Sequence, residues 1–312
     1  MQPLRTVAGV GHKGFGEASR LRRAADDVRL LMPLVDLQPI DTRTMFRPVS
    51  AELVVLLRTL APNDWERPTI AGEWLVRDIV AHLADTALRR LSFHRDGMTP
   101  PPPSRPITGA RDFVDFINGL NAQWVATSKR FSPSVLTELF GRASADLADW
   151  FEALPLDGPA LFGVSWAGEQ TSDSWFDIGR EFTELWHHQQ QIRMAVGAPS
   201  LPDSRYLRAV IDVAVRGLPH AFRDVGAETG HTVAIDVGGP AGGKWTLVRE
   251  ADRWAIYAGT PDVATTRIQL LDDATWKLLF NALTDADAAD VIQIEGRPEL
   301  ARPLLRARSV IV

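Results

Sequence analysis

Apolar residues recur at helical spacing over most of the chain between residues 45 and 200. The run VSAELVVLLRTL predicts a first helix over residues 50–61, with Ser50 as its N-cap and Glu52 in its first turn. The run WLVRDIVAHLADTALRRLSFHRDG predicts a second helix of about six turns that ends at a glycine. A proline-rich run, TPPPPSRPITG, then predicts a loop over residues 99–109.

Three further amphipathic runs follow this loop. RDFVDFINGLNAQWVATSKR and SPSVLTELFGRASADLADWFEAL predict two helices, the second opened by Ser132 or Ser134 and ended before Pro155. DSWFDIGREFTELWHHQQQIRMAVG predicts a longer helix that is capped near Asp173 and ends at Gly197. The pattern therefore predicts a helix bundle as the first domain, over residues 45–200.

The hydrophobic period changes in the last third of the chain. After one more helical run, SRYLRAVIDVAVRGLPHAF, the segments HTVAIDV, KWTLVRE and RWAIYAG alternate as strands do and are separated by glycine turns. ATTRIQLL and VIQIEG predict two more strands, and DDATWKLLFNAL and RPELARPLLRAR predict two more helices. We expect a second, small α/β domain over residues 201–312, so the predicted fold class is α followed by α/β.

Residues 1–44 carry no pattern that connects them to the rest. They combine a glycine-rich run, GVGHKGFGE, with a basic run, RLRRAADDVRLL. A phosphate-binding loop is disfavoured because no strand precedes the glycines and the lysine–hydroxyl pair of such loops is missing. We interpret these residues as an N-terminal extension, with its order left open and Met45 as a candidate true start.

Composition excludes several classes of function. A formal net charge of -5 gives no electrostatic reason to bind nucleic acid, and no apolar run reaches the roughly 20 residues that cross a bilayer. The N-terminus also lacks a signal-peptide pattern, so we expect a cytoplasmic protein without a membrane partner. The chain has no cysteine, which excludes disulfides, thiolate metal ligands and a sulfur nucleophile of its own. Any thiol chemistry requires an external thiol.

A candidate metal site follows from residue spacing. Residues four apart lie on one face of a helix, so Glu184 and His188 can bind the same ion, and His82 on the second helix supplies a third ligand. Each helix carries a polar stripe around these residues, which could also simply face solvent. His187 is an alternative to His188, whereas the remaining histidines have no such partners and are expected at the surface or in the core (His12, His94, His220 and His231).

Three protein ligands leave positions open for water or substrate, as in catalytic sites. Zinc is the first expectation for the divalent metal. Iron(II), nickel and manganese stay open because geometry cannot be read from spacing.

The two segments around these residues resemble a known family. TIAGEWLVRDIVAHLADTALRRL is similar to the opening of mycothiol-dependent maleylpyruvate isomerases and other DinB-like proteins, and FTELWHHQQQIR is similar to their Glu-x-Trp-x-His segment. The resemblance spans residues 46–200, and the C-terminal part resembles their small, sterol-carrier-like α/β domain. It implies a DinB-like four-helix bundle with His82, Glu184 and His188 as metal ligands.

The resemblance also implies a chemistry. A low-molecular-weight thiol, mycothiol or another, would be deprotonated near the metal, add to an activated double bond of a small acidic substrate, and leave after rotation. Arg77, Arg89 and Arg180 are candidates to hold a substrate carboxylate. Arg253 and Arg267 are candidates in the second domain, and neither is preferred.

The sequence departs from the isomerase pattern in two places. Glutamines fill positions 189–191, where an acidic residue often follows the histidine, and the N-terminal extension is unusual, so the substrate stays open.

Two other functions are alternatives to the isomerase. A metal hydrolase or biosynthetic enzyme that uses no thiol would need the same ligands. A non-catalytic protein that binds metal and carries an apolar ligand in its second domain is the other alternative; thiol-dependent turnover or bound lipid would separate the three. The sequence makes no prediction of oligomeric state.

Overall fold

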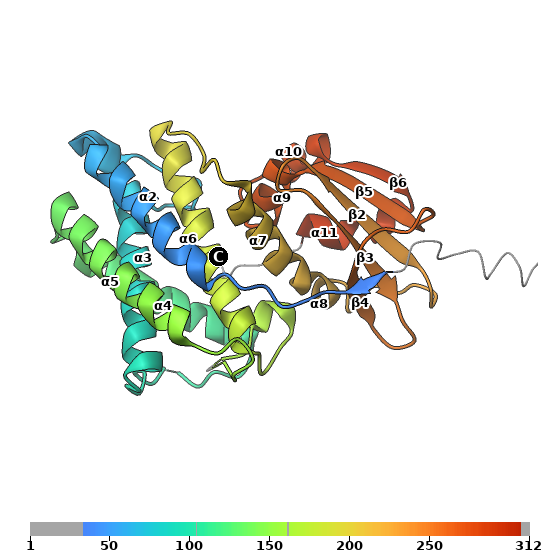
Figure 1. The fold of residues 1–312 in the computed structure, drawn as a ribbon, viewed down its shortest axis with the longest axis horizontal. Coiled ribbons are helices and arrows are strands. Elements are labelled where there is room, and N and C mark those ends of the chain that lie inside the picture. Colours follow the sequence, from blue (N-terminus) through green and yellow to red (C-terminus); the bar gives the residue numbers. More distant parts are fainter. Residues whose placement is uncertain (1–33, 104, 161, 307–312) are drawn as a thin grey trace, which may run out of the picture.

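A computed structural model describes residues 34–103, 105–160 and 162–306. The glycine-rich and basic runs of the predicted extension, together with His12, lie outside the described residues. The structure consists of a helical domain and a mixed-sheet domain that lie side by side (Figure 1). This order confirms the predicted fold class.

The helical domain is a four-helix bundle with one additional helix. Helices α2 (Phe46–Thr59), α3 (Val76–Arg90), α5 (Pro133–Ala153) and α6 (Ser174–Val196) pack around a common core, and α4 (Ala110–Ser128) packs on α3. Their apolar stripes meet in the centre, where Leu53, Ile79, Leu136 and Phe182 are fully buried. No helix among the described residues is long and apolar enough to cross a bilayer.

The helix ends agree with the sequence patterns in some places and differ in others. Ser132 caps α5 and accepts a hydrogen bond from the Val135 amide, and Gly197 ends α6 in the left-handed conformation. The prediction of Ser50 as an N-cap is wrong, because α2 begins at Phe46 after a short 3-10 turn, η1 (Arg43–Met45), and Ser50 lies buried inside the helix. Helix α3 continues as a π turn, η3 (Leu91–Arg95), before Gly97.

A six-stranded mixed sheet forms the second domain. Strand order is β1-β4-β3-β2-β5-β6, and β2 pairs with β5 in parallel while the other neighbouring pairs are antiparallel. The strands are β1 (Val35–Asp36), β2 (Thr232–Gly238), β3 (Gly243–Arg249), β4 (Trp254–Ala258), β5 (Thr266–Leu271) and β6 (Gln293–Gly296). The helices are α7 (Ser204–Ala214), α8 (Leu218–Ala221), α9 (Asp272–Leu279), α10 (Asp285–Val291) and α11 (Arg302–Arg306).

Two elements of this domain had no signal in the hydrophobic pattern. Helix α10 is only seven residues long and rich in Asp and Ala, and β1 has two residues. Strand β1 belongs to the predicted N-terminal extension, yet it pairs with β4 at the edge of the sheet. From there the chain returns to the bundle, where Arg43 donates a hydrogen bond of 2.6 Å to the Leu154 carbonyl oxygen.

The two domains share one continuous core of buried side chains. Helix α7 lies between them and contacts both α6 and α9 (Figure 1). Gly179 of α6 makes this close approach possible, because a Cβ atom there would lie 2.9 Å from Val213 Cγ2 of α7.

We therefore expect Gly179→Ala to lower the free energy of unfolding by about 1–3 kcal/mol through overpacking. Gly119→Ala in α4 is the matched control, because nothing lies within 4 Å of an added Cβ there. That change should raise the free energy of unfolding by about 0.5–1 kcal/mol, since alanine favours a helix more than glycine does. Urea unfolding of both variants measures the difference, and equal effects would contradict the close helix contact.

Candidate metal centre

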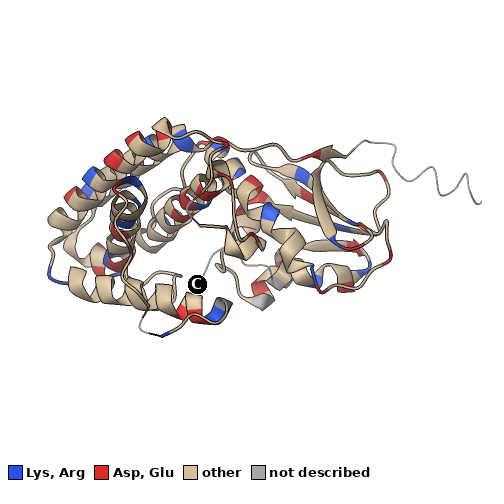
Figure 2. Ribbon diagram, turned by 90° about the horizontal axis from the view of Figure 1, so that it is seen from below, with Lys and Arg blue, Asp and Glu red and all other residues tan. Residues whose placement is uncertain are grey.

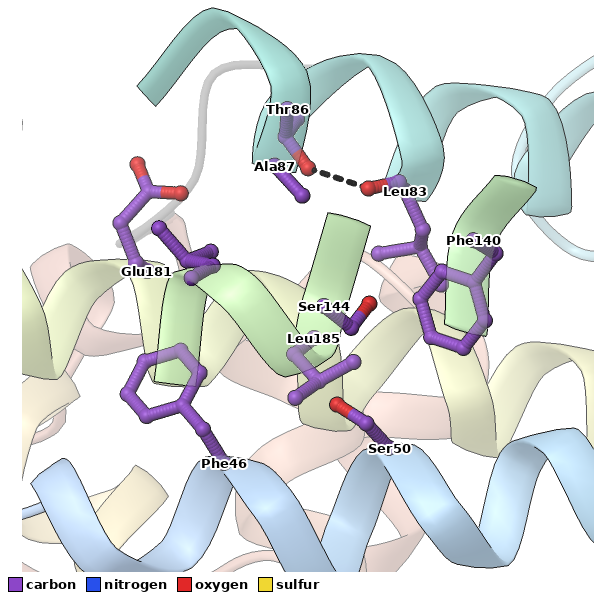
Figure 3. A pocket seen from close by; sticks show the side chains of 10 residues that line it. Phe46, Ser50, Leu83, Thr86, Ala87, Phe140, Ser144, Glu181 and Leu185 are labelled. Carbon is purple, nitrogen blue, oxygen red and sulfur yellow. Dashed lines mark hydrogen bonds between the residues drawn. The ribbon is translucent and has the colours of Figure 1, made fainter. Parts of the chain in front are cut away.

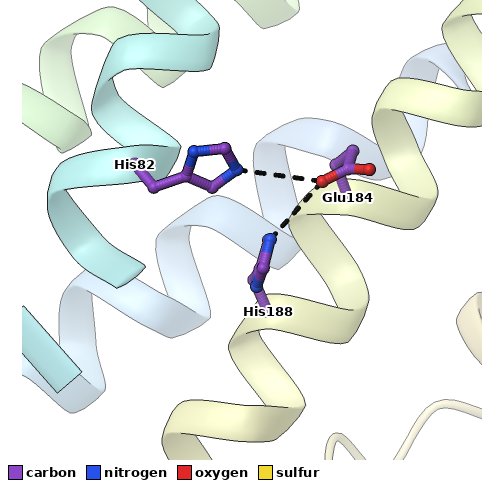
Figure 4. Close-up of side chains that lie close together, drawn as sticks. All are labelled: His82, Glu184 and His188. Atoms are coloured by element: carbon purple, nitrogen blue, oxygen red, sulfur yellow. Dashed lines mark ion pairs between the residues drawn. The ribbon is translucent and has the colours of Figure 1, made fainter. Parts of the chain in front are cut away.

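Two neighbouring helices of the bundle position the predicted ligands. Helix α3 carries His82, and α6 carries Glu184 and His188 one turn apart. Figure 4 shows both imidazoles directed at the same carboxylate oxygen of Glu184. The polar stripes of the two helices thus face each other inside the protein, and the interpretation that they face solvent is wrong.

The three side chains are close enough to share one ion. Glu184 Oε2 lies 3.4 Å from His188 Nε2 and 3.9 Å from His82 Nε2, and the three ligand atoms lie within 4.8 Å of one another. Ligand atoms around a tetrahedral zinc ion at about 2.1 Å lie about 3.4 Å apart, so only small side-chain movements are needed. His82, Glu184 and His188 form the candidate metal centre.

Neighbouring groups orient the two imidazoles. The Nδ1 atom of His188 lies 2.7 Å from Gln191 Oε1, and because an amide oxygen only accepts, Nδ1 carries the proton and Nε2 is left free as a ligand. Trp74 covers both rings, with centroid distances of 4.9 Å to His82 and 6.0 Å to His188. The Nδ1 atom of His82 is buried and has no hydrogen-bond partner among the described residues.

The protonation states suit a cation. Burial lowers the pKa of His82 to about 4, although Glu184 acts in the opposite direction. Burial alone would raise the pKa of Glu184, but its interactions with His188 and His82 outweigh burial and hold that pKa well below the usual value. At neutral pH His82 is therefore neutral and Glu184 ionised, as metal ligands must be.

His187 does not belong to the candidate metal centre. Its Nδ1 atom lies 2.7 Å from the Thr183 carbonyl oxygen, and its ring stacks on Phe280 of the second domain. Burial lowers the pKa of His187 to about 3. The structure brings His188, and not His187, together with His82 and Glu184.

A buried cluster of charges lies next to the candidate metal centre along α3 and α6. Basic and acidic residues are interspersed along the bundle helices (Figure 2), but Arg90, Asp177 and Glu181 are each less than 9% exposed. Arg90 donates hydrogen bonds of 2.7 and 2.8 Å to Asp177 and of 2.6 Å to Glu181, and Arg180 contacts both carboxylates. Residue spacing on α3 and α6 gave no sign that Arg90 meets these carboxylates.

The charge cluster also accounts for the surroundings of His94. Its Nδ1 atom accepts a hydrogen bond of 2.6 Å from Arg90 Nη1, since a guanidinium only donates. Burial, and then the charge of Arg90, lower the pKa of His94 to about 4. His94 is thus a partner of the charge cluster and is absent from the candidate metal centre.

The arginines predicted to hold a substrate carboxylate have different surroundings. Arg77 bonds to Glu66 and to the carbonyl oxygens of Lys129 and Phe131, and Arg180 is held by the charge cluster. Arg89 follows His82 by two turns, lies 3.0 Å from Asp85 and donates to Asn121 Oδ1 at 2.9 Å. The second-domain candidates are also paired, Arg253 with Glu250 and Arg267 with Asp236.

A small cavity lies in the centre of the bundle near Glu181. Its volume is about 20 Å³, enough for a single water molecule and too small for a substrate. The buried hydroxyl of Ser50, which has no hydrogen-bond partner in the part of the chain that the structure describes, lies at this cavity with Ser144 (Figure 3). The lining residues are Phe46, Ser50, Leu83, Thr86, Ala87, Phe140, Ser144, Leu147, Glu181 and Leu185.

Fold and site together define the class of protein: a helix bundle with a buried two-histidine, one-carboxylate cluster, followed by a mixed-sheet domain. Residues 46–193 match the family described as Mycothiol maleylpyruvate isomerase N-terminal domain. The helical domain of this chain therefore belongs to that family, as its two motifs predicted.

Comparison with solved structures gives weaker likenesses. The crystal structure of the mycothiol-dependent maleylpyruvate isomerase is 12% identical and covers 81% of this chain and 91% of that chain, with a TM-score of 0.49. A histidine-to-alanine mutant of that enzyme gives the same identity and coverage with a TM-score of 0.48. The solution structure of sterol carrier protein domain 2 of Helicoverpa armigera is 19% identical over 33% of this chain and 80% of that chain, with a TM-score of 0.21. No curated protein matches the chain by sequence.

Proposed function

We propose that this protein is a metal-dependent enzyme that uses a low-molecular-weight thiol to isomerise, or transfer a group to, a small acidic unsaturated substrate. The observation that carries the proposal is the candidate metal centre, in which two imidazole nitrogens and one carboxylate converge between α3 and α6. Three protein ligands leave coordination positions for other groups, which is typical of catalytic rather than structural sites. Membership of the helical domain in the isomerase family supports the reaction class.

We assign different roles to the residues in and around the candidate metal centre. His82, Glu184 and His188 would hold the divalent ion, for which zinc is the first candidate. When bound, such an ion favours the deprotonated form of a thiol beside it and polarises a substrate oxygen. Gln191 favours the tautomer of His188 whose Nε2 atom carries no proton, and Trp74 packs against both imidazoles.

Turnover assays with and without a thiol test this proposal. We expect the zinc-loaded protein to isomerise maleylpyruvate when mycothiol is present and not when it is omitted. The matched control is Glu184→Gln, which keeps the size of the side chain and removes the ligand charge. Turnover of an ester or amide without thiol would favour the hydrolase alternative. Lack of any turnover, together with lipid that co-purifies with the protein, would favour the non-catalytic protein that carries an apolar ligand.

We further propose that Arg89 binds the carboxylate of the substrate. It lies on the face of α3 that carries His82, and its charge contributes to the low pKa of that histidine. Its Nε atom lies 3.0 Å from Asp85 Oδ2 and Nη2 donates to Asn121, so among the described residues Nη1 is the nitrogen left to donate to a substrate carboxylate.

Replacing Arg89 by methionine should raise KM for the acidic substrate by about 10–100-fold, because a charge-assisted hydrogen bond to an anion contributes about 1.5–3 kcal/mol. Metal content should not change. Arg77→Met on the same helix is the control, because Arg77 is occupied by Glu66 and two carbonyl oxygens. An unchanged KM in the Arg89 variant would exclude this role.

A further inference from the structure

A stack of three aromatic rings connects the second domain to the candidate metal centre. Phe280, at the end of α9, stacks on His187 with ring centroids 5.0 Å apart and an interplanar angle of 26°. His187 in turn lies 4.0 Å from the ring of His188, at 35°. His188 also meets His82 edge-on, with ring centroids 4.9 Å apart. One ring of the second domain is thus separated from a metal-ligand candidate by a single side chain.

The middle ring of this stack is fixed on its own helix. His187 is 3% exposed, and its Nδ1 atom is bonded to the Thr183 carbonyl oxygen one turn earlier. His187 is not one of the three ligand candidates, so it is not needed to hold the metal directly. Its ring instead lies between those of Phe280 and His188.

The outer ring is fixed by the end of α9. The Ala282 amide donates to the Lys277 carbonyl oxygen at 2.7 Å and the Asn281 amide to the Leu278 carbonyl oxygen at 3.4 Å, which is the Schellman arrangement. Asn281 has a φ of +56°, a conformation that asparagine tolerates better than most residues. This turn leaves Phe280 2% exposed against His187.

A second aromatic contact crosses the same interface without touching the candidate metal centre. Trp186 of α6 meets Trp276 of α9 edge-on, with ring centroids 5.5 Å apart. On α6 the two contacts come from consecutive residues, and on the other side from Trp276 within α9 and Phe280 at its C-cap, one turn apart. Only the contact of Phe280 continues to a ligand candidate, so Trp276 offers a built-in comparison.

We propose that Phe280 is a positioning residue that fixes His188 through His187, so that docking of the second domain and metal binding are coupled. This inference rests on the proposed function, because it requires an ion at His82, Glu184 and His188. Gln191 fixes the tautomer of His188, and the stack fixes the face of its ring. Coupling is reciprocal: if the stack raises metal affinity, metal binding stabilises the stack by the same factor.

Cobalt titration of the full-length apo protein tests the first half of this coupling. We expect Phe280→Leu to weaken Co²⁺ binding about tenfold, the lower end of what loss of an outer support of a metal ligand costs, and to shift the Co²⁺ absorption bands. Trp276→Phe should leave affinity and bands unchanged. Equal weakening in both variants would mean that the interface acts only by general packing, and would overturn the proposal.

Variants of His187 separate ring positioning from loss of stability. His187→Leu should weaken Co²⁺ binding as Phe280→Leu does, whereas His187→Phe, which retains a ring between Phe280 and His188, should restore it. Failure of His187→Phe to restore binding, while the variant is folded, would also overturn the proposal.

Hydrogen exchange tests the reciprocal half. Zinc should slow exchange of the amides of residues 280–282 in the parent protein and not in His187→Leu. If the parent protein itself binds neither zinc nor cobalt, the proposed function fails. If it binds metal and the four variants bind equally well, the metal centre stands and the coupling fails.

Discussion

Replacing Arg90 by methionine should lower the free energy of unfolding by about 3–5 kcal/mol at pH 7, the usual cost of removing one partner from a buried ion pair. Arg90 is 5% exposed and donates to both Asp177 and Glu181. Without it, two buried carboxylates keep only the more exposed Arg180 as a cation. Urea unfolding measures the loss, and Arg142→Met is the control because its pair with Glu138 is exposed.

The free energy of unfolding of Arg90→Met should change with pH in the opposite direction from that of the parent protein. Burial alone would raise the pKa of Asp177 and Glu181, but Arg90 and Arg180 hold both values below the ordinary 3.8 and 4.5. These groups stabilise the parent above their unfolded pKa values, and this stability is lost as the pH falls through the folded ones. In Arg90→Met burial dominates, so the folded pKa values rise above the unfolded ones and stability increases as the pH falls from 7 to 5.

A stability deficit that stays constant between pH 7 and pH 5 would contradict the buried charge cluster. So would a loss as small as that of Arg142→Met, which should stay within about 0.5 kcal/mol. Both variants lose one arginine, but Arg90 and its two acidic partners are buried, whereas Arg142 and its single partner Glu138 are exposed.

Glu184→Gln should weaken zinc binding by more than about 100-fold, the upper end of what loss of an outer-sphere partner costs. Glu184 is the one carboxylate of the candidate metal centre, and its Oε2 atom faces both imidazoles. An amide of the same size keeps the packing but supplies no charge. The free energy of unfolding of the apo protein should change far less than the metal affinity, because the carboxylate is not part of the apolar core.

Competition with a chromophoric chelator measures the affinity. His94→Ala is the control, because His94 contacts Arg90 and not the three ligand candidates. If His94→Ala lost metal to the same degree, or Glu184→Gln lost none, the assignment of the ligands would be wrong.

Much of the helical domain could be predicted from local patterns. The spacing of Glu184 and His188 on one helix, and the motif around His82 on another, indicated which side chains meet, and the structure brings them together. Ser132 and Gly197 marked helix ends correctly because caps depend on neighbouring backbone groups only. The prediction that Ser50 is an N-cap was wrong because a buried serine inside a helix looks the same in sequence as a capping serine.

The rest depends on contacts between distant segments. The pairing of β1 with β4 joins residues more than 200 positions apart, and two residues carry no periodicity of their own. Arg90 appeared to be an ordinary helix arginine, because its partners lie 87 and 91 residues away on α6. The stack of Phe280 on His187 likewise requires the placement of the second domain, which no local pattern determines.

Elemental analysis of the purified protein, with His82→Ala and His188→Ala beside it, tests the metal centre most directly. Each variant removes one imidazole from a different helix. We expect about one transition-metal ion per chain in the parent protein, lost in both variants while they stay folded. A parent protein that is free of metal and cannot be loaded, or a His82→Ala protein that retains its full metal content, would contradict the assignment of this metal centre.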